Sequence, residues 1–133
     1  MDKPVLVVDD EADLAVSYER LLRRQGYRVV AVGSRRAGLL AIEAEAPRLV
    51  IADVRLPDGD GLDIVRAARA LPAPPPVLVA TVLASRASYR AALAAGATAF
   101  LPKPFTTDAF SSLVRQLLAT APEPPRRDEH GVQ

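Results

Sequence analysis

The chain has 133 residues, of which 50% are apolar and 25% are charged, which suits one globular domain with a single hydrophobic core. Its formal net charge of +1 excludes a general attraction to nucleic acids or to anionic membranes. Because the chain contains no cysteine, disulfides and thiolate metal sites are excluded as well.

Short apolar runs alternate along the chain with longer segments of helical periodicity. The predicted strands are 4–8, 28–32, 48–52, 76–81 and 97–101. The first run is too short for a signal peptide or a membrane-spanning helix, so we expect a cytoplasmic protein that does not contact a membrane. Each run contains three or four consecutive apolar residues without polar alternation, which is typical of parallel strands covered by helices on both faces.

The segments after the strands carry apolar residues at every third or fourth position, as amphipathic helices do. Ser34 and Thr106 or Thr107 mark predicted helix starts, and Gly26 and Gly96 mark predicted helix ends. The alternation predicts an α/β fold of the (βα)5 type, with a parallel five-stranded sheet between two layers of helices.

The composition changes near Thr120. Residues 120–133 contain three prolines and a run of four charges from Arg126 to Glu129. We therefore expect one domain over residues 1–119, followed by a disordered tail or the first part of a linker.

Five polar residues stand at the ends of apolar runs: Asp9, Asp10, Asp53, Thr81 and Lys103. The carboxyl ends of parallel strands meet at one edge of a sheet, so we expect these side chains to converge there. Mg2+ prefers oxygen ligands and usually takes one or two carboxylates together with phosphate and water. A carboxylate can also attack a phosphoryl group, provided that cations offset the developing charge. The pattern predicts a phosphate-accepting magnesium site.

Each of these residues also has a structural explanation when it is considered alone. The Asp9-Asp10 pair can cap a helix, and Asp53 can be a turn residue. Thr81 can be a strand-end hydroxyl, and Lys103 can be a solvated loop charge. Their joint occurrence at matching strand ends favours the functional interpretation.

The motifs around these positions are specific: Val7-Val8-Asp9-Asp10-Glu11, Asp53 with Leu56-Pro57-Asp58-Gly59-Asp60-Gly61, Thr81, Gly96-Ala97, and Leu101-Pro102-Lys103-Pro104-Phe105. Across residues 3–119 the chain resembles the CheY-like receiver domain of bacterial two-component response regulators. The resemblance implies a flavodoxin-like three-layer sandwich with strand order 2-1-3-4-5. It also implies a phosphorylation-controlled role in signal transduction.

The resemblance assigns the acceptor and the metal ligands. Asp53 would accept a phosphoryl group from a sensor histidine kinase or a phosphotransfer protein. Asp9, Asp10, Asp53 and the main-chain carbonyl of Arg55 would hold Mg2+.

The resemblance also assigns a switch. Thr81 and Lys103 would bind the phosphoryl oxygens, and Thr81 and Phe100 would change the surface formed by residues 84–118. A downstream effector domain, a target protein or a second phosphorylated copy would recognise that surface. We expect no direct nucleic acid binding by this segment.

Two other functions share part of the pattern. Dehalogenase-type phosphatases also use a strand-end aspartate with Mg2+, but they typically carry a second aspartate two residues later, where this chain has Arg55. A docking module that works without phosphorylation is the other alternative. We expect a signalling domain and not an enzyme, apart from catalysis of its own phosphorylation and dephosphorylation.

Overall fold

The computed structural model describes residues 3–120. The strands are β1 (Val5–Val8), β2 (Val29–Val32), β3 (Leu49–Ala52), β4 (Arg55–Leu56), β5 (Gly59–Asp60), β6 (Val77–Thr81) and β7 (Ala99–Pro102). The helices are α1 (Ala12–Arg24), α2 (Arg35–Glu45), α3 (Leu62–Arg69), α4 (Arg86–Ala95) and α5 (Thr107–Thr120).

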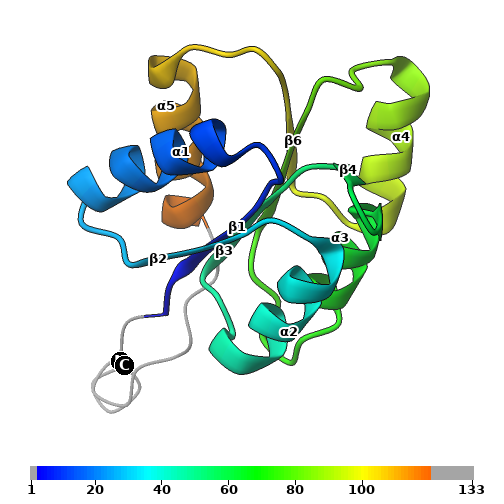
Figure 1. Ribbon diagram of the computed structural model, residues 1–133, viewed down its shortest axis with the longest axis horizontal. Helices are drawn as coiled ribbons and strands as arrows, with labels where there is room; N and C mark the ends of the chain where they lie inside the picture. Colours follow the sequence, from blue (N-terminus) through cyan, green and yellow to red (C-terminus); the bar gives the residue numbers. More distant parts are fainter. Residues whose placement is uncertain (1–2, 121–133) are drawn as a thin grey trace, which may run out of the picture.

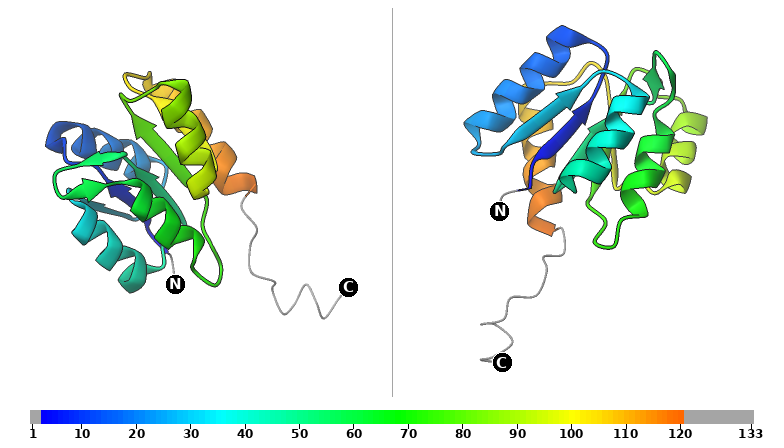
Figure 2. Two further views of the ribbon diagram at one scale, coloured as in Figure 1. Left: turned by 90° about the vertical axis from the view of Figure 1, so that its right-hand side faces the viewer. Right: turned by 60° about the horizontal axis from the view of Figure 1, so that its bottom comes forward.

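Five strands form one parallel sheet in the order β2-β1-β3-β6-β7. Because β6 and β7 are the fourth and fifth strands of this sheet along the chain, the order is the expected 2-1-3-4-5. Figure 1 shows α1 and α5 on one face of the sheet and α2, α3 and α4 on the other. The views in Figure 2 show the same three layers, so the predicted flavodoxin-like (βα)5 fold is confirmed.

The continuous apolar strands are explained by two cores, one on each face of the sheet. Side chains of successive strand residues point to opposite faces. Leu6 and Val8 of β1 therefore pack with α2, α3 and α4, whereas Val5 and Val7 pack with α1 and α5. All four side chains are fully buried, which is why β1 shows no polar alternation.

The predicted helix caps are present. The Ser34 hydroxyl accepts a hydrogen bond from the Ala37 N–H at 3.1 Å and begins α2. The Thr106 hydroxyl accepts one from the Ala109 N–H at 3.0 Å, so α5 begins at Thr107. Gly96 ends α4 in the left-handed region. These local contacts confirm the boundaries that the capping residues indicate.

The β4–β5 hairpin directly after Asp53 is not predicted by the sequence. Arg55 pairs with Asp60, and Leu56 pairs with Gly59. Two-residue strands are too short to show a period of two, so the sequence indicates only a turn here. Gly61 lies between this hairpin and α3. Its position requires glycine, because a side-chain carbon there would collide with the main-chain carbonyl oxygen of Asp53.

Two further expectations concern membrane-spanning helices and the C-terminal tail. None of the helices within residues 3–120 is long and apolar enough to span a membrane. The expected tail lies, from residue 121 onward, outside the described residues.

Tyr18 lies on α1 beneath the Lys103 loop. Its ring stacks on Phe105 at 5.7 Å and on Phe110 at 4.9 Å between ring centroids. The residue is 1% exposed, and its hydroxyl has no hydrogen-bond partner within the described part of the chain. Burial raises the pKa of this hydroxyl above its ordinary value, so it stays protonated.

We expect Tyr18→Phe to raise the free energy of unfolding by about 1 kcal/mol, because an unpaired buried hydroxyl is unfavourable and the ring contacts are kept. Urea unfolding measures the change. Tyr18→Leu is the control, since it removes both the hydroxyl and the stacked ring and should destabilise the fold. A less stable phenylalanine variant would show that the hydroxyl is paired in solution.

Candidate functional site

The predicted site residues lie at the carboxyl edge of the sheet. Asp9 and Asp10 follow β1, Asp53 follows β3, Thr81 ends β6 and Lys103 follows β7. These four strands are neighbours in the sheet. One carboxylate oxygen from each of Asp9, Asp10 and Asp53 lies within 4.8 Å of the others. The sheet therefore brings together the three carboxylates that the sequence places at separate strand ends.

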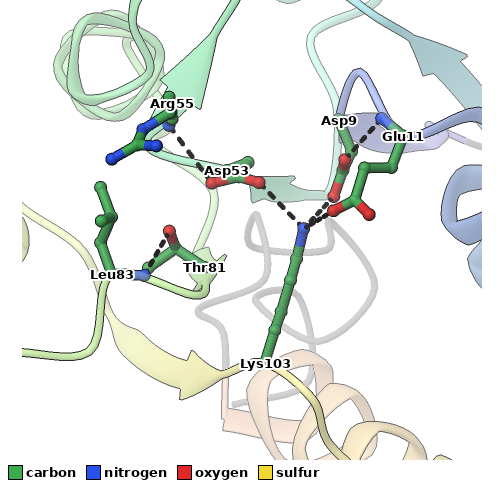
Figure 3. Close-up of polar contacts among 7 residues, drawn as sticks. All are labelled: Asp9, Glu11, Asp53, Arg55, Thr81, Leu83 and Lys103. Atoms are coloured by element: carbon green, nitrogen blue, oxygen red, sulfur yellow. Dashed lines mark hydrogen bonds and ion pairs between the residues drawn. The ribbon is translucent and has the colours of Figure 1, made fainter.

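Lys103 joins two of these carboxylates directly. Figure 3 shows its side chain extending from the end of β7 to Asp53 on one side and Asp9 on the other. The ammonium Nζ is 2.7 Å from Asp9 Oδ2 and 2.9 Å from Asp53 Oδ2. The three side chains are 5%, 2% and 8% exposed for Lys103, Asp9 and Asp53, so the contacts are shielded from solvent. Ion pairs in such surroundings are little screened by salt.

The electrostatic balance of this cluster is uneven. Burial alone would lower the pKa of Lys103, but the hydrogen bonds to Asp9 and Asp53 outweigh burial and raise it, so the ammonium stays charged. Burial raises the pKa of Asp9, although the hydrogen bond from Lys103 opposes that shift. One ammonium therefore offsets only part of the charge of three neighbouring carboxylates.

Main-chain groups fix the two buried carboxylates. Asp9 Oδ1 accepts a hydrogen bond from the Glu11 N–H at 3.0 Å, and Asp53 Oδ1 accepts one from the Arg55 N–H at 3.2 Å. Each carboxylate thus has one oxygen on the backbone two residues later and the other on Lys103. This arrangement limits the side-chain rotation of Asp53 before any ligand binds.

Thr81 and Phe100 occupy different surroundings from the carboxylates. Thr81 is fully buried, and its hydroxyl accepts a hydrogen bond from the Leu83 N–H at 3.2 Å. Figure 3 shows Thr81 and Leu83 together, with the Leu83 side chain extending toward Arg55. Phe100 is half-buried on β7 and lies edge-on to Tyr89 of α4, with ring centroids 5.5 Å apart. The aromatic pair links the site edge of the sheet to α4.

Glu11 is a site residue that the sequence analysis does not single out. Its Oε1 lies 3.2 Å from Lys103 Nζ, and its side chain is 60% exposed. Lys103 therefore contacts two buried carboxylates and one at the rim. The available signal was the third acidic residue in the run Asp9-Asp10-Glu11, which places another carboxylate at the same strand end.

The response regulator receiver domain is the family whose model matches this chain, over residues 5–115. The chain belongs to this family. The match covers most of the chain and includes the site residues at the carboxyl edge of the sheet. Most of this chain aligns with response regulators.

Several relatives are transcriptional or response regulators. The response regulator MprA of Mycolicibacterium vanbaalenii is 37% identical over 114 residues, which cover 86% of this chain and 49% of that protein. The KDP operon transcriptional regulatory protein KdpE of Escherichia coli is 35% identical over 125 residues, covering 90% of this chain and 55% of that protein. The chain thus spans about half the length of these relatives.

Solved structures of receiver domains share the fold. A CheY-like response regulator receiver domain protein from Methanospirillum hungatei has a TM-score of 0.84 at 28% identity, covering 90% of this chain and 95% of that one. A response regulator signal receiver domain from Bermanella marisrubri has a TM-score of 0.79 at 30% identity, covering 89% and 99%. Both likenesses extend over nearly the whole receiver domain. The family that the sequence resembles is therefore confirmed: the chain is a receiver domain homologous to response regulators, and neither alternative function is favoured.

Proposed function

We propose that Asp53 is the phosphoryl acceptor of this receiver domain and that Lys103 and Thr81 bind the transferred group. The observation that carries the proposal is the buried contact of Lys103 with both Asp9 and Asp53 at the sheet edge. A cation held beside a carboxylate nucleophile can offset the charge that the incoming phosphoryl group brings. The donor would be a sensor histidine kinase or a phosphotransfer protein.

The donor set fits Mg2+. Asp9, Asp10 and Asp53 offer three carboxylate oxygens close together, and the main-chain carbonyl of Arg55 would supply a neutral fourth ligand. Hard oxygen ligands are what this ion prefers, and the excess negative charge of the cluster favours a divalent cation. When bound, Mg2+ would neutralise charge on the phosphoryl oxygens during transfer.

The residues of the chain then have separate tasks. An oxygen of the Asp53 carboxylate attacks the phosphorus, the bond from phosphorus to the donor atom breaks, and an acyl phosphate forms. The Arg55 N–H keeps the carboxylate in a fixed orientation for in-line attack. Lys103 donates hydrogen bonds to the phosphoryl oxygens, since its ammonium already reaches the acceptor.

The signal would leave the site through Thr81. When its hydroxyl donates to a phosphoryl oxygen, the β6–α4 loop that it contacts through Leu83 can follow it. Phe100 then changes its packing against Tyr89, and the surface of residues 84–118 is altered. An effector domain, a target protein or a second phosphorylated copy would bind that surface in the cytoplasm.

Incubation with acetyl phosphate and Mg2+ followed by intact-mass measurement tests the proposal. We expect the mass of one phosphoryl group to be added, with little addition in EDTA and none for Asp53→Asn. A docking module that works without phosphorylation would stay unmodified in every condition. A phosphatase would release inorganic phosphate from many added phosphate esters in repeated turnovers.

We expect Asp10→Asn to weaken Mg2+ binding by at least roughly tenfold while raising the metal-free unfolding free energy by about 0.5 kcal/mol. Asp10 is the exposed member of the cluster, so its removal relieves repulsion without uncovering a buried charge. Calorimetric titration and thermal melting measure the two effects. A lower melting temperature of the metal-free variant would contradict the repulsion within the cluster.

A further inference from the structure

Asp58, in the turn of the β4–β5 hairpin, fastens the hairpin to the N-terminus of α2. Its Oδ1 accepts a hydrogen bond from the Arg35 N–H at 2.7 Å, and its Oδ2 accepts one from the Arg36 N–H at 2.9 Å. The first N–H groups of a helix have no partner inside the helix, so a carboxylate there makes charge-assisted hydrogen bonds. Ser34 caps α2 from the preceding residue, whereas Asp58 reaches it from a segment 22 and 23 residues further along the chain.

The Arg35 side chain supports the same hairpin at a second point. Its Nε donates to Asp63 Oδ2 of α3 at 2.8 Å. A Cβ atom on Gly59 would lie 2.7 Å from Arg35 Cδ, and Gly59 has a φ of +152°. The glycine therefore permits both the turn and the close approach of the arginine chain. The turn lies between the start of α2 and the start of α3.

The other end of the hairpin leads directly to the acceptor. Arg55 pairs with Asp60 across the hairpin, and its N–H donates to Asp53 Oδ1. Gly61 packs against the main-chain carbonyl of Asp53. The segment between the acceptor and α3 is thus held at its base by the acceptor strand and at its tip by Asp58.

These contacts favour the ionised form of the Asp58 carboxyl group. Hydrogen bonds from the Arg36 and Arg35 N–H groups lower the pKa of Asp58 below its ordinary value. The carboxylate therefore remains a double acceptor at neutral pH. Both of its oxygens are engaged by α2.

We propose that Asp58 is a positioning residue for the metal site: by tying the hairpin to α2 it holds the segment whose Arg55 carbonyl would be a ligand of Mg2+. The inference rests on the proposed function and names a residue that would not touch the ion. A ligand held in place by its neighbours does not have to be ordered when the metal binds, so such neighbours strengthen metal binding.

The test compares Mg2+ binding by calorimetry in the wild type, Asp58→Ala and Asp58→Asn, at low and high salt. We expect Asp58→Ala to raise the Kd for Mg2+ roughly tenfold, and Asp58→Asn to have a smaller effect because one oxygen acceptor is kept. The loss should persist at high salt. Amide hydrogen exchange over residues 54–61 should become faster in Asp58→Ala, which reports on the hairpin without any metal.

Asp13→Asn is the matched control, because it removes one exposed carboxylate from the first turn of α1 and leaves the hairpin unchanged. The inference is overturned if Asp58→Ala weakens Mg2+ binding no more than this control, or if its effect disappears at high salt, as a long-range charge effect would. Unchanged exchange over residues 54–61 would overturn it as well. If Asp58→Ala does not fold, Asp58→Asn decides by the same criteria. A wild type that binds no Mg2+ would instead contradict the proposed metal site itself, and with it this inference.

Discussion

Lys103→Met is expected to destabilise the metal-free domain by about 3 kcal/mol, because it leaves the buried carboxylates of Asp9 and Asp53 without their cation. Part of this stability should return when Mg2+ is added, since a divalent cation replaces the missing charge. Urea unfolding with and without Mg2+ measures both effects. The same variant should accept phosphate from acetyl phosphate about 100-fold more slowly, because one group that stabilises the transferred oxygens is lost.

The chain offers a matched control for this substitution. Lys3 is the other lysine, and it is exposed at the start of the described residues. Lys3→Met makes the same chemical change away from the site and should alter neither stability nor phosphorylation. If the two methionine variants unfold at the same urea concentration without metal, the Lys103 contacts contribute nothing to the fold. Equal phosphorylation rates would remove Lys103 from the proposed chemistry.

Thr81→Ala is expected to separate phosphorylation from its structural consequence. A hydrogen bond from the Thr81 hydroxyl to a charged phosphoryl oxygen is worth about 1.5–3 kcal/mol. Its loss should reduce the bias toward the phosphorylated conformation by roughly 10- to 150-fold while Asp53 still accepts the group. Amide NMR signals of residues 84–118, recorded with and without acetyl phosphate, measure this bias.

Thr98→Ala controls for the loss of a threonine hydroxyl that accepts a hydrogen bond from the main chain. The Thr98 hydroxyl accepts a hydrogen bond from the Val77 N–H at 2.9 Å, at the opposite end of β6 from Thr81. We expect this variant to show the full spectral change upon phosphorylation. If Thr81→Ala responds as strongly as Thr98→Ala, the signal reaches α4 by a route that does not involve the Thr81 hydroxyl.

The residues that the sequence predicts for the site are those whose position depends on strand ends. Asp9, Asp53 and Lys103 meet because each follows a strand of one parallel sheet, and apolar runs are visible without any long-range information. The fold follows from the same pattern, since continuous apolar strands require helices on both faces. The ion pairs of Asp9 and Asp53 with Lys103 are a consequence of this convergence at the sheet edge.

The features that the sequence does not predict depend on contacts between distant segments or on very short elements. Asp58 caps a helix that begins 23 residues earlier, so no local pattern marks it as a cap. The β4–β5 hairpin has two residues in each strand, too few for a period. Tyr18 belongs to an ordinary helical stripe, and its position beneath the Lys103 loop follows only from how α1 packs against α5.

The central claim is that Asp53 forms an acyl phosphate, and reductive trapping tests it most directly. Borohydride reduces an aspartyl phosphate to homoserine, which leaves a permanent mark that peptide mass spectrometry locates. After incubation with acetyl phosphate and Mg2+, we predict homoserine at position 53 and unmodified aspartate at positions 9 and 10. Homoserine at position 9 or 10, phosphate on the Thr81 hydroxyl, or unmodified Asp53 in a protein that has gained phosphate would contradict the account.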